Sequence, residues 1–284
     1  MQNDEMPFQN VSTLEEVREF WNRKSCGEVF AEGANRKEQF DSHARARYDL
    51  EPHIHSFARF EEGAGKDVLE IGTGMGADHL EWAKAGPKTL TGVDLTPRAI
   101  SWAKERFSTY GYESNLQVAD AENLPFADNS FDIVYSWGVL MSSPDTQQTF
   151  REIVRVLRPG GITRIMLYNK FSLVAYMLWA RWGVLGGDPF HGLSYYAERH
   201  LESPGTKLYS ANEARVMLKK AGLTEIDVST RLTASDLLLG VTGQNHPGAL
   251  LEIAKRLYPR WFAKRFLKRH GLNLMIQARK ALVT

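Results

Sequence analysis

The stretch DVLEIGTGMG, residues 67–76, decides the fold. Its first five positions are mostly apolar and predict a short buried strand, and Gly72, Gly74 and Gly76 follow at once. Glycine adopts backbone conformations that other residues avoid, and it lets another molecule approach the main chain closely. A strand that runs into such a loop is typical of α/β sheets that hold a nucleotide-like ligand at this edge.

Apolar runs and amphipathic segments alternate along the chain around this stretch. Strands are predicted at 67–71, 89–94, 115–119, 131–136, 162–168, 223–230 and 272–280. Helices are predicted at about 13–22, 37–60, 76–85, 97–110, 145–157 and 210–221. This alternation is typical of an α/β fold with a Rossmann-like, mostly parallel sheet covered by helices on both faces. We expect seven strands, the last of them antiparallel.

Three regions lie outside the regular alternation. Residues 1–60 are predicted to form a helical N-terminal cover or lid, and residues 61–284 the sheet domain. Helical insertions into that domain are expected at about 171–209 and 233–270. Binding residues often lie on irregular segments that a regular scaffold positions. We therefore expect a second ligand, beside the one at the glycine loop, to bind beneath these insertions.

Composition and charge narrow the function. The 284 residues carry a formal net charge of +1, which gives no global attraction to nucleic acid, and no nucleic-acid partner is expected. Cys26 is the one cysteine, so a disulfide framework and a cysteine-based metal site are excluded, and no metal is predicted. No signal-peptide pattern opens the sequence and no apolar run reaches the roughly 20 residues of a membrane span, which predicts a cytoplasmic protein.

Acidic residues mark three successive strand ends. Glu70 precedes the glycine loop, Asp94 ends the second predicted strand and Asp120 follows the third. GTGMGA also fits the fingerprint of a dinucleotide-binding loop, but a carboxylate at Glu70 disfavours a pyrophosphate and favours a cation. Carboxylates can accept hydrogen bonds from ribose hydroxyls and from an adenine amine. The acids therefore favour a positively charged adenosine ligand without phosphate, and the ligand of that description is S-adenosylmethionine.

Five motifs carry a family resemblance. They are VLEIGTGMG, GVDLT, DAENLPF, FDIVYSWGVL and VLRPGG, and they follow one another in this order between residues 67 and 161. The run resembles the class I S-adenosylmethionine-dependent methyltransferases, in particular the group related to the quinone-biosynthesis C-methylases. The resemblance implies a methyltransferase, of EC class 2.1.1, with S-adenosyl-L-methionine as cofactor and S-adenosyl-L-homocysteine as product. RARYDLEP, in the predicted cover, is similar to an element that folds over the cofactor in relatives.

The resemblance also implies a set of cofactor contacts. Along the glycine loop and the next two strand ends, they run from the amino acid end of the cofactor to its adenine: Glu70, Gly72, Thr73, Gly74, Asp94, Leu95, Asp120 and Ala121. Four further residues are expected near the sulfonium and the cofactor carboxylate: Ser136, Trp137, Arg47 and Tyr48. Structural alternatives stay open, because Asp94 could cap the next helix, Asp120 could be a surface acid and Arg47 could lie on a solvated helix face.

Methyl transfer is an in-line displacement, so the enzyme mainly aligns the acceptor with the methyl group and excludes water. In relatives the segment after GVL often carries a His pair, whereas here it reads MSSPDT, which leaves the identity of any base in doubt. Tyr168, at the end of the fifth predicted strand, is the best-placed candidate. The predicted acceptor pocket comprises Met141, Tyr176, His191 and Tyr195.

Two unusual segments bear on the acceptor. Residues 171–185 are nearly all apolar, which indicates core packing, a lid over an apolar acceptor or contact with a membrane surface. Residues 254–270 hold seven Lys and Arg, interleaved with aromatic residues and without an acid. They form a solvated face or a docking site for an anionic membrane surface, an acidic peptide or a nucleic acid.

We therefore expect transfer to O, N or C of a small, fairly apolar acceptor, with a peptide acceptor as the alternative. Two further hypotheses remain. The protein could bind the cofactor without transferring its methyl group, or it could be a nicotinamide dehydrogenase, which Glu70 and Asp120 disfavour. The pattern leaves the oligomeric state open.

Overall fold

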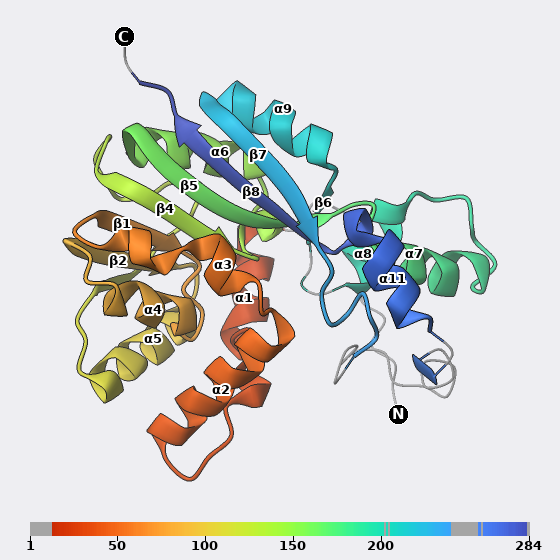
Figure 1. The fold of residues 1–284 in the computed structure, drawn as a ribbon, viewed down its shortest axis with the longest axis horizontal. Coiled ribbons are helices and arrows are strands. Elements are labelled where there is room, and N and C mark those ends of the chain that lie inside the picture. Colours follow the sequence, from red (N-terminus) through yellow and green to blue (C-terminus); the bar gives the residue numbers. More distant parts are fainter. Residues whose placement is uncertain (1–12, 202, 204, 240–254, 257, 283–284) are drawn as a thin grey trace.

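The computed structural model describes residues 13–201, 203, 205–239, 255–256, 258 to 282. Figure 1 shows a twisted central sheet with helices on both faces and a helical lobe beyond one end of the strands. Among the described residues, no helix is both long and apolar enough to cross a bilayer.

Within the described residues the sheet has eight strands, and seven of them lie in the order β3-β2-β1-β4-β5-β8-β7. Their bounds are β1 Asp67–Ile71, β2 Thr89–Asp94, β3 Asn115–Val118, β4 Phe131–Trp137, β5 Leu157–Asn169, β6 Leu208–Tyr209, β7 Leu223–Arg231 and β8 Asn273–Lys280. Strands β1 to β5 pair in parallel, and β8 runs antiparallel between β5 and β7. The seven predicted strands and the antiparallel last one are confirmed. The additional β6 was missed, because two residues beside β5 carry no alternating pattern.

Helices α4 (Ala77–Lys84) and α5 (Pro97–Tyr110) cover one face of the sheet, and α6 (Thr146–Val156) and α9 (Ala211–Ala221) the other (Figure 1). The sequence sets their ends. Thr96 caps α5, Pro97 occupies its first turn and Gly111 ends it with a left-handed backbone. Each helix therefore begins close to the carboxyl end of a strand, where a ligand site can form.

The N-terminal helices differ from the prediction at one point. Helix α1 (Leu14–Arg23) is followed by the short helix η1 (Glu28–Phe30), and the single helix predicted at 37–60 is broken. It forms α2 (Arg36–Leu50), α3 (Ile54–Ala58) and η2 (Phe60–Gly63) instead. The break has a clear cause, because Pro52 lacks an N–H group and disfavours helical geometry in Glu51 before it.

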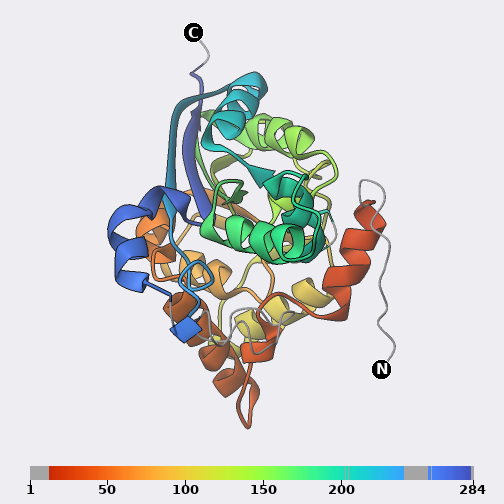
Figure 2. The same cartoon turned by 90° about the vertical axis from the view of Figure 1, so that its right-hand side faces the viewer.

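The apolar segment at 171–185, inside the helical insertion expected at about 171–209, consists of α7 (Leu173–Leu178) and a π-helical continuation, η4 (Trp179–Val184). Helix α8 (Leu193–His200) lies in the same insertion and packs on α7, and both contribute to a second, smaller core. Of the predicted insertion at 233–270, the described helices are α11 (Arg260–Phe266) and η5 (Lys268–His270). Residues 240–254 and 257 lie outside the described part. Figures 1 and 2 show α7, α8 and α11 together beyond the ends of β5 and β8.

A buried arginine joins helix α2 to helix α5 and the glycine loop. Arg106 of α5 is almost fully buried and donates hydrogen bonds to the carbonyl of Met75 (2.7 Å) and to Nδ1 of His43 in α2 (3.0 Å). Burial, helped by the guanidinium groups of Arg106 and Arg47, lowers the pKa of His43 to about 3. His43 therefore stays neutral in the folded protein at pH values where an unfolded histidine is protonated.

We expect this histidine to make the protein sensitive to acid. Below pH 6.5 the unfolded chain binds a proton at His43 that the native state excludes, so stability falls as pH decreases toward 3. Replacement His43→Gln keeps one donor and one acceptor but cannot titrate. Between pH 7 and 5 the wild type should lose about 2 kcal/mol more unfolding free energy than the variant, measured by urea denaturation. Equal losses in both proteins would contradict the assignment.

Candidate active site

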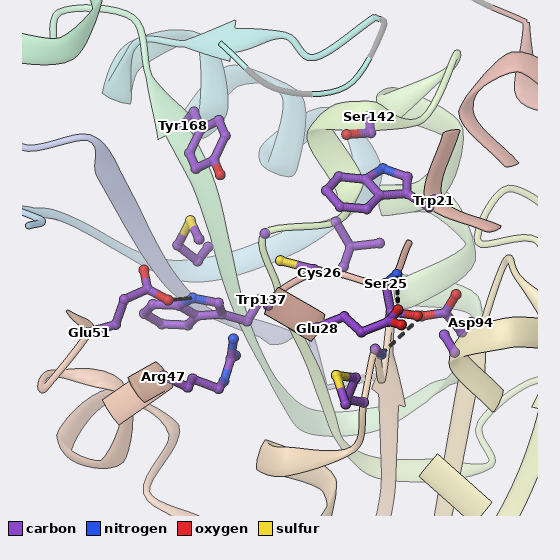
Figure 3. Close-up of a pocket in the computed structure, with 18 of the residues that line it drawn as sticks. Trp21, Ser25, Cys26, Glu28, Arg47, Glu51, Asp94, Trp137, Ser142 and Tyr168 are labelled. Carbon is purple, nitrogen blue, oxygen red and sulfur yellow. Dashed lines mark hydrogen bonds between the residues drawn. The ribbon is translucent and has the colours of Figure 1, made fainter. Parts of the chain in front are cut away.

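A cavity of about 1150 Å³ lies at the carboxyl ends of the central strands, beneath the N-terminal helices (Figure 3). Its wall contains the glycine loop, the ends of β2, β4 and β5, and residues from α1, η1, α2 and α7. All of the predicted cofactor residues except Tyr48 and Ser136 line it. Pockets for one small ligand usually measure about 300–1000 Å³, so this cavity is larger than that range.

The glycine loop combines packing with access. Gly72 has a φ of +82°, and a Cβ added there would come within 2.1 Å of a methyl group of Val139. Gly74 has a φ of +50°, but a Cβ there would meet no atom within 4 Å, because it borders the open cavity. Between them, the buried hydroxyl of Thr73 has no hydrogen-bond partner among the described residues. The first glycine is required for packing, and the rest of the loop offers polar groups to a ligand.

Asp94 holds the loop and faces the cavity. Its Oδ2 accepts from the backbone N–H of Gly74 (3.0 Å), and its Oδ1 accepts from the N–H and hydroxyl of Thr96 (2.9 and 3.0 Å). The cap of α5 is Thr96 itself, whose hydroxyl accepts from Ala99. Burial raises the pKa of Asp94 despite these donors. Since a carboxylate oxygen can accept more than one hydrogen bond, both oxygens retain capacity for ligand hydroxyls.

Glu70 lines the cavity but differs from the sequence interpretation in its charge. Ser114 donates its hydroxyl proton to the carbonyl of Leu90 (2.9 Å), so it accepts from Nε2–H of His79 (2.7 Å). Nδ1 of His79 and Oε2 of Glu70, 2.9 Å apart, then share one proton. Burial raises the pKa of Glu70 well above its usual range and lowers that of His79 to about 3, which puts the proton on Glu70. The pair is neutral, so Glu70 does not attract a cation by net charge.

Arg47 and Tyr48 meet at a buried acid that the sequence interpretation missed. Arg47 binds Asp78 through two nitrogens (2.7 and 2.6 Å), and the hydroxyls of Tyr48 and Tyr135 donate to the same carboxylate (3.1 and 2.7 Å). These partners hold the pKa of Asp78 below its usual value although burial opposes this. Arg47 also lines the cavity and retains Nη1 for a ligand, whereas Tyr48 does not line it. The signal for Asp78 was an acid in the first turn of the helix after the glycine loop.

The residues that were predicted to contact the adenine lie together at the cavity wall. Leu95, Asp120 and Ala121 all line it. Oδ1 of Asp120 accepts from the N–H of Glu122 (2.9 Å), which fixes the turn after β3. The acid therefore orders its own loop and remains at the cavity wall.

At the end of β4, one predicted residue lines the cavity and its neighbour does not. Trp137 lines it and donates its indole N–H to Oε2 of Glu51 (2.9 Å), while Oε1 of Glu51 accepts from Asn273 (2.7 Å). Ser136 is fully buried and donates to the carbonyl of Ile71 (2.9 Å). Successive side chains of a strand point to opposite faces, and here the hydroxyl of Ser136 is bound inside the sheet domain, away from the cavity.

The four residues predicted for the acceptor pocket do not line the cavity. Met141 is buried in the core, and the ring of Tyr176 packs against His270, with centroids 5.9 Å apart. His191 stacks on Tyr195 at 3.9 Å, at the start of α8. Residue type alone suggested these positions, and their placement depended on helix faces that had not been assigned.

Other residues form the part of the cavity wall that lies away from the glycine loop. Tyr168 lies at the end of β5 with its hydroxyl directed into the cavity (Figure 3). Val174, Met177 and Leu178 line it from one face of α7, at i, i+3, i+4 spacing. Further apolar residues from distant segments complete this side: Leu140, Leu201, Leu238 and Leu272.

The N-terminal helices supply cavity residues that carried no recognisable motif: Trp21, Ser25, Cys26, Glu28 and Glu51 (Figure 3). The buried hydroxyl of Ser25 has no hydrogen-bond partner in the described part of the chain. With Thr73 it makes two unpaired hydroxyls at this wall, which fits a ligand rich in hydrogen-bonding groups. Across the described ranges, no group of three or more His, Cys, Asp or Glu residues could hold a metal ion.

Known proteins are similar to this chain in sequence. A family described as a methyltransferase domain matches residues 69–165. Methyltransferase GfsG of Streptomyces halstedii is 35% identical over 37% of this chain and 38% of its own length. The ubiquinone/menaquinone biosynthesis C-methyltransferase UbiE of Geotalea daltonii is 29% identical over 66% of this chain and 89% of its own. Sterol 4-C-methyltransferase strm-1 of Caenorhabditis elegans is 34% identical over 38% and 33%. The matched region spans about two fifths of the first relatives' length.

Solved structures show the same fold. The [4+2]-cyclase SpnF superimposes with a TM-score of 0.52 at 17% identity, covering 86% of this chain and 82% of that one. A SAM-dependent methyltransferase of Methanosarcina mazei gives a TM-score of 0.52 at 20% identity, over 82% and 98%. The matched domain, the ordered motifs and this sheet together support a class I S-adenosylmethionine-dependent methyltransferase that is related to the UbiE C-methyltransferases.

Proposed function

We propose that this protein transfers a methyl group from S-adenosylmethionine to O, N or C of a small, fairly apolar acceptor. The observation that carries the proposal is one continuous cavity. It joins the glycine loop and Asp94 to the apolar side of α7, with Trp137 between the two ends. Its volume of about 1150 Å³ is enough for a cofactor and an acceptor together.

The cofactor end is assigned from the polar groups that line it. Asp94 would accept the ribose hydroxyls and Asp120 the adenine amine, while Gly74 borders the space beneath the ligand. Nη1 of Arg47 would meet the cofactor carboxylate, and Trp137 would lie near the sulfonium. When bound, S-adenosylmethionine supplies a methyl group on a positively charged sulfur, which is already a good leaving group.

At the acceptor end, apolar side chains bury the substrate and Tyr168 is the polar group best placed to orient it or to take its proton. Two of the quoted relatives are named for small molecules, a quinone and a sterol, which supports a small acceptor here. The peptide alternative rests only on the charge of residues 254–270, and no relative quoted above is named for a peptide.

We further propose that residues 1–60 act as a cover, since α1, η1 and α2 contribute to the cavity wall. Residues 61–284 would then form the catalytic domain, with the insertions at about 171–209 and 233–270 shaping the acceptor end. The first test is to mix the protein with methyl-labelled cofactor and an extract of the cells that produce it. Label in the organic phase supports the proposal, and label only in precipitated protein contradicts it.

We expect Asp94→Asn to weaken binding of S-adenosylhomocysteine by about tenfold or more, because the variant loses charge-assisted hydrogen bonds to the ribose. Isothermal calorimetry measures this affinity. Asp128→Asn removes an acid whose side chain is 69% exposed and pairs with Arg155, and it should bind like the wild type. If Asp94→Asn also binds like the wild type, Asp94 is not the ribose ligand.

We expect Tyr168→Phe to lower methyl transfer into the organic extract by about 100-fold, the usual contribution of a positioned acid or base, without changing affinity for S-adenosylhomocysteine. Tyr209→Phe is the matched control. Its hydroxyl donates to Thr146 (2.8 Å) from the neighbouring strand β6, outside the cavity wall. Equal turnover in both variants would remove Tyr168 from the reaction.

A further inference from the structure

Helix α11 and the adjoining η5 present a surface that the proposed reaction does not use. We call it the basic aromatic face, and its side chains are Trp261, Phe262, Lys264, Arg265, Phe266, Lys268 and Arg269. All seven are exposed, and the one buried residue of α11 is Ala263. The helix lies on the outer side of the lobe formed with α7 and α8 (Figures 1 and 2).

Three aromatic rings gather on this face. Trp261 is 71% exposed, Phe266 57% and Phe262 42%. Their ring centroids lie 4.9 to 6.4 Å apart, so they form one cluster rather than three scattered side chains. Leaving such large apolar groups in water is unfavourable, and a cluster of this kind marks a surface that another phase or molecule covers.

Cationic side chains surround the rings. Among the described residues, Lys264, Arg265, Lys268 and Arg269 make no recorded ion pair with an acid. No Asp or Glu occurs between residues 255 and 270. Because the whole chain carries only +1, this positive charge is a local feature of the face. Its complement is a negatively charged surface that also offers apolar contact.

An anionic lipid bilayer meets both requirements. Aromatic side chains settle at the boundary between headgroups and acyl chains, while Lys and Arg attract acidic headgroups. A bound peptide would need a groove with side-chain pockets. None of the seven residues lines the cavity described above, and the rings project outward.

The face is joined directly to the cavity wall. Arg260, at the start of α11, donates to the carbonyls of Leu237 (3.0 Å) and Leu238 (3.3 Å). Leu238 lines the cavity, and so does Leu272, which follows η5. A surface that binds the basic aromatic face therefore lies beside the apolar end of the cavity.

We propose that the basic aromatic face docks the protein on anionic lipid bilayers, with the rings of α11 at the interface and the cations of α11 and η5 on the headgroups. Docking would bring the proposed acceptor end close to a source of apolar substrate. This last step rests on the proposed function, whereas the docking itself does not.

Vesicle sedimentation tests the proposal. The full-length protein should partition onto phosphatidylcholine vesicles that contain about one third phosphatidylglycerol, and much less onto phosphatidylcholine alone. Lys264→Glu/Arg265→Glu should weaken partition by about tenfold or more. Lys219→Glu/Lys220→Glu on α9 is the matched control, because it reverses two adjacent exposed cations elsewhere, and it should stay within about twofold of the wild type.

A second variant tests the rings separately. Trp261→Ala/Phe266→Ala keeps every charge and should lose most of the partition that remains at high salt, where screening weakens the electrostatic part. Circular dichroism checks that each variant is folded.

Several outcomes would overturn docking on lipid. The first is that the wild type does not partition onto the anionic vesicles, and the second is that the α9 control loses as much partition as Lys264→Glu/Arg265→Glu. The third is that the protein binds poly-L-glutamate but not vesicles, which would favour an acidic peptide. If vesicles bind but S-adenosylhomocysteine does not raise the melting temperature, the proposed methyl transfer fails and the docking stands.

Discussion

The ion pair between Asp78 and Arg47 is the contact on which the arrangement of the site depends. Asp78 begins the helix after the glycine loop and is buried, so its charge is tolerable only with partners. Those partners come from the cover, through Arg47 and Tyr48, and from the sheet, through Tyr135. A single carboxylate thereby sets the distance between the N-terminal helices and the central strands. Both Asp78 and Arg47 line the cavity, which lies between the N-terminal helices and the strand ends.

The two ends of the cavity are built from different kinds of sequence. The proposed cofactor end comes largely from strand ends and the turns after them, whose residues lie close to a recognisable motif. The apolar end is assembled from α7, the segment near Leu238 and the start of β8. Since these segments are not fixed by the sheet, relatives can change them while the glycine loop stays the same. The same fold occurs in a structure named for cyclisation as well as in a methyltransferase.

The sequence was sufficient for features that depend on local patterns. The central strands, the helices between them and the residues of the glycine loop followed from apolar alternation and glycine spacing. The sequence was insufficient where the direction of a side chain depends on which face of a strand it occupies, or where its partner is distant in the chain. Ser136 lies one residue from Trp137 and points to the opposite face, and the buried carboxyl of Glu70 pairs with a histidine nine residues away. Met141 and His191 were chosen by residue type, without the tertiary packing that keeps both out of the cavity wall.

Glu51 and Asn273 join at the cavity across 222 positions of the chain. Glu51 lies at the end of α2, and Asn273 is the first residue of the last strand, β8. Strand β8 must insert between β5 and β7 before Asn273 can donate its hydrogen bond to Glu51. Contacts of such separation form only after the intervening chain is organised, because long loops are costly to close. The glycine loop is held by Asp94, 20 positions away, whereas the wall beside it needs the contact between Glu51 and Asn273. Ligand binding there is therefore a property of the completely folded chain, and an incompletely synthesised chain would hold the signature motif without the binding site.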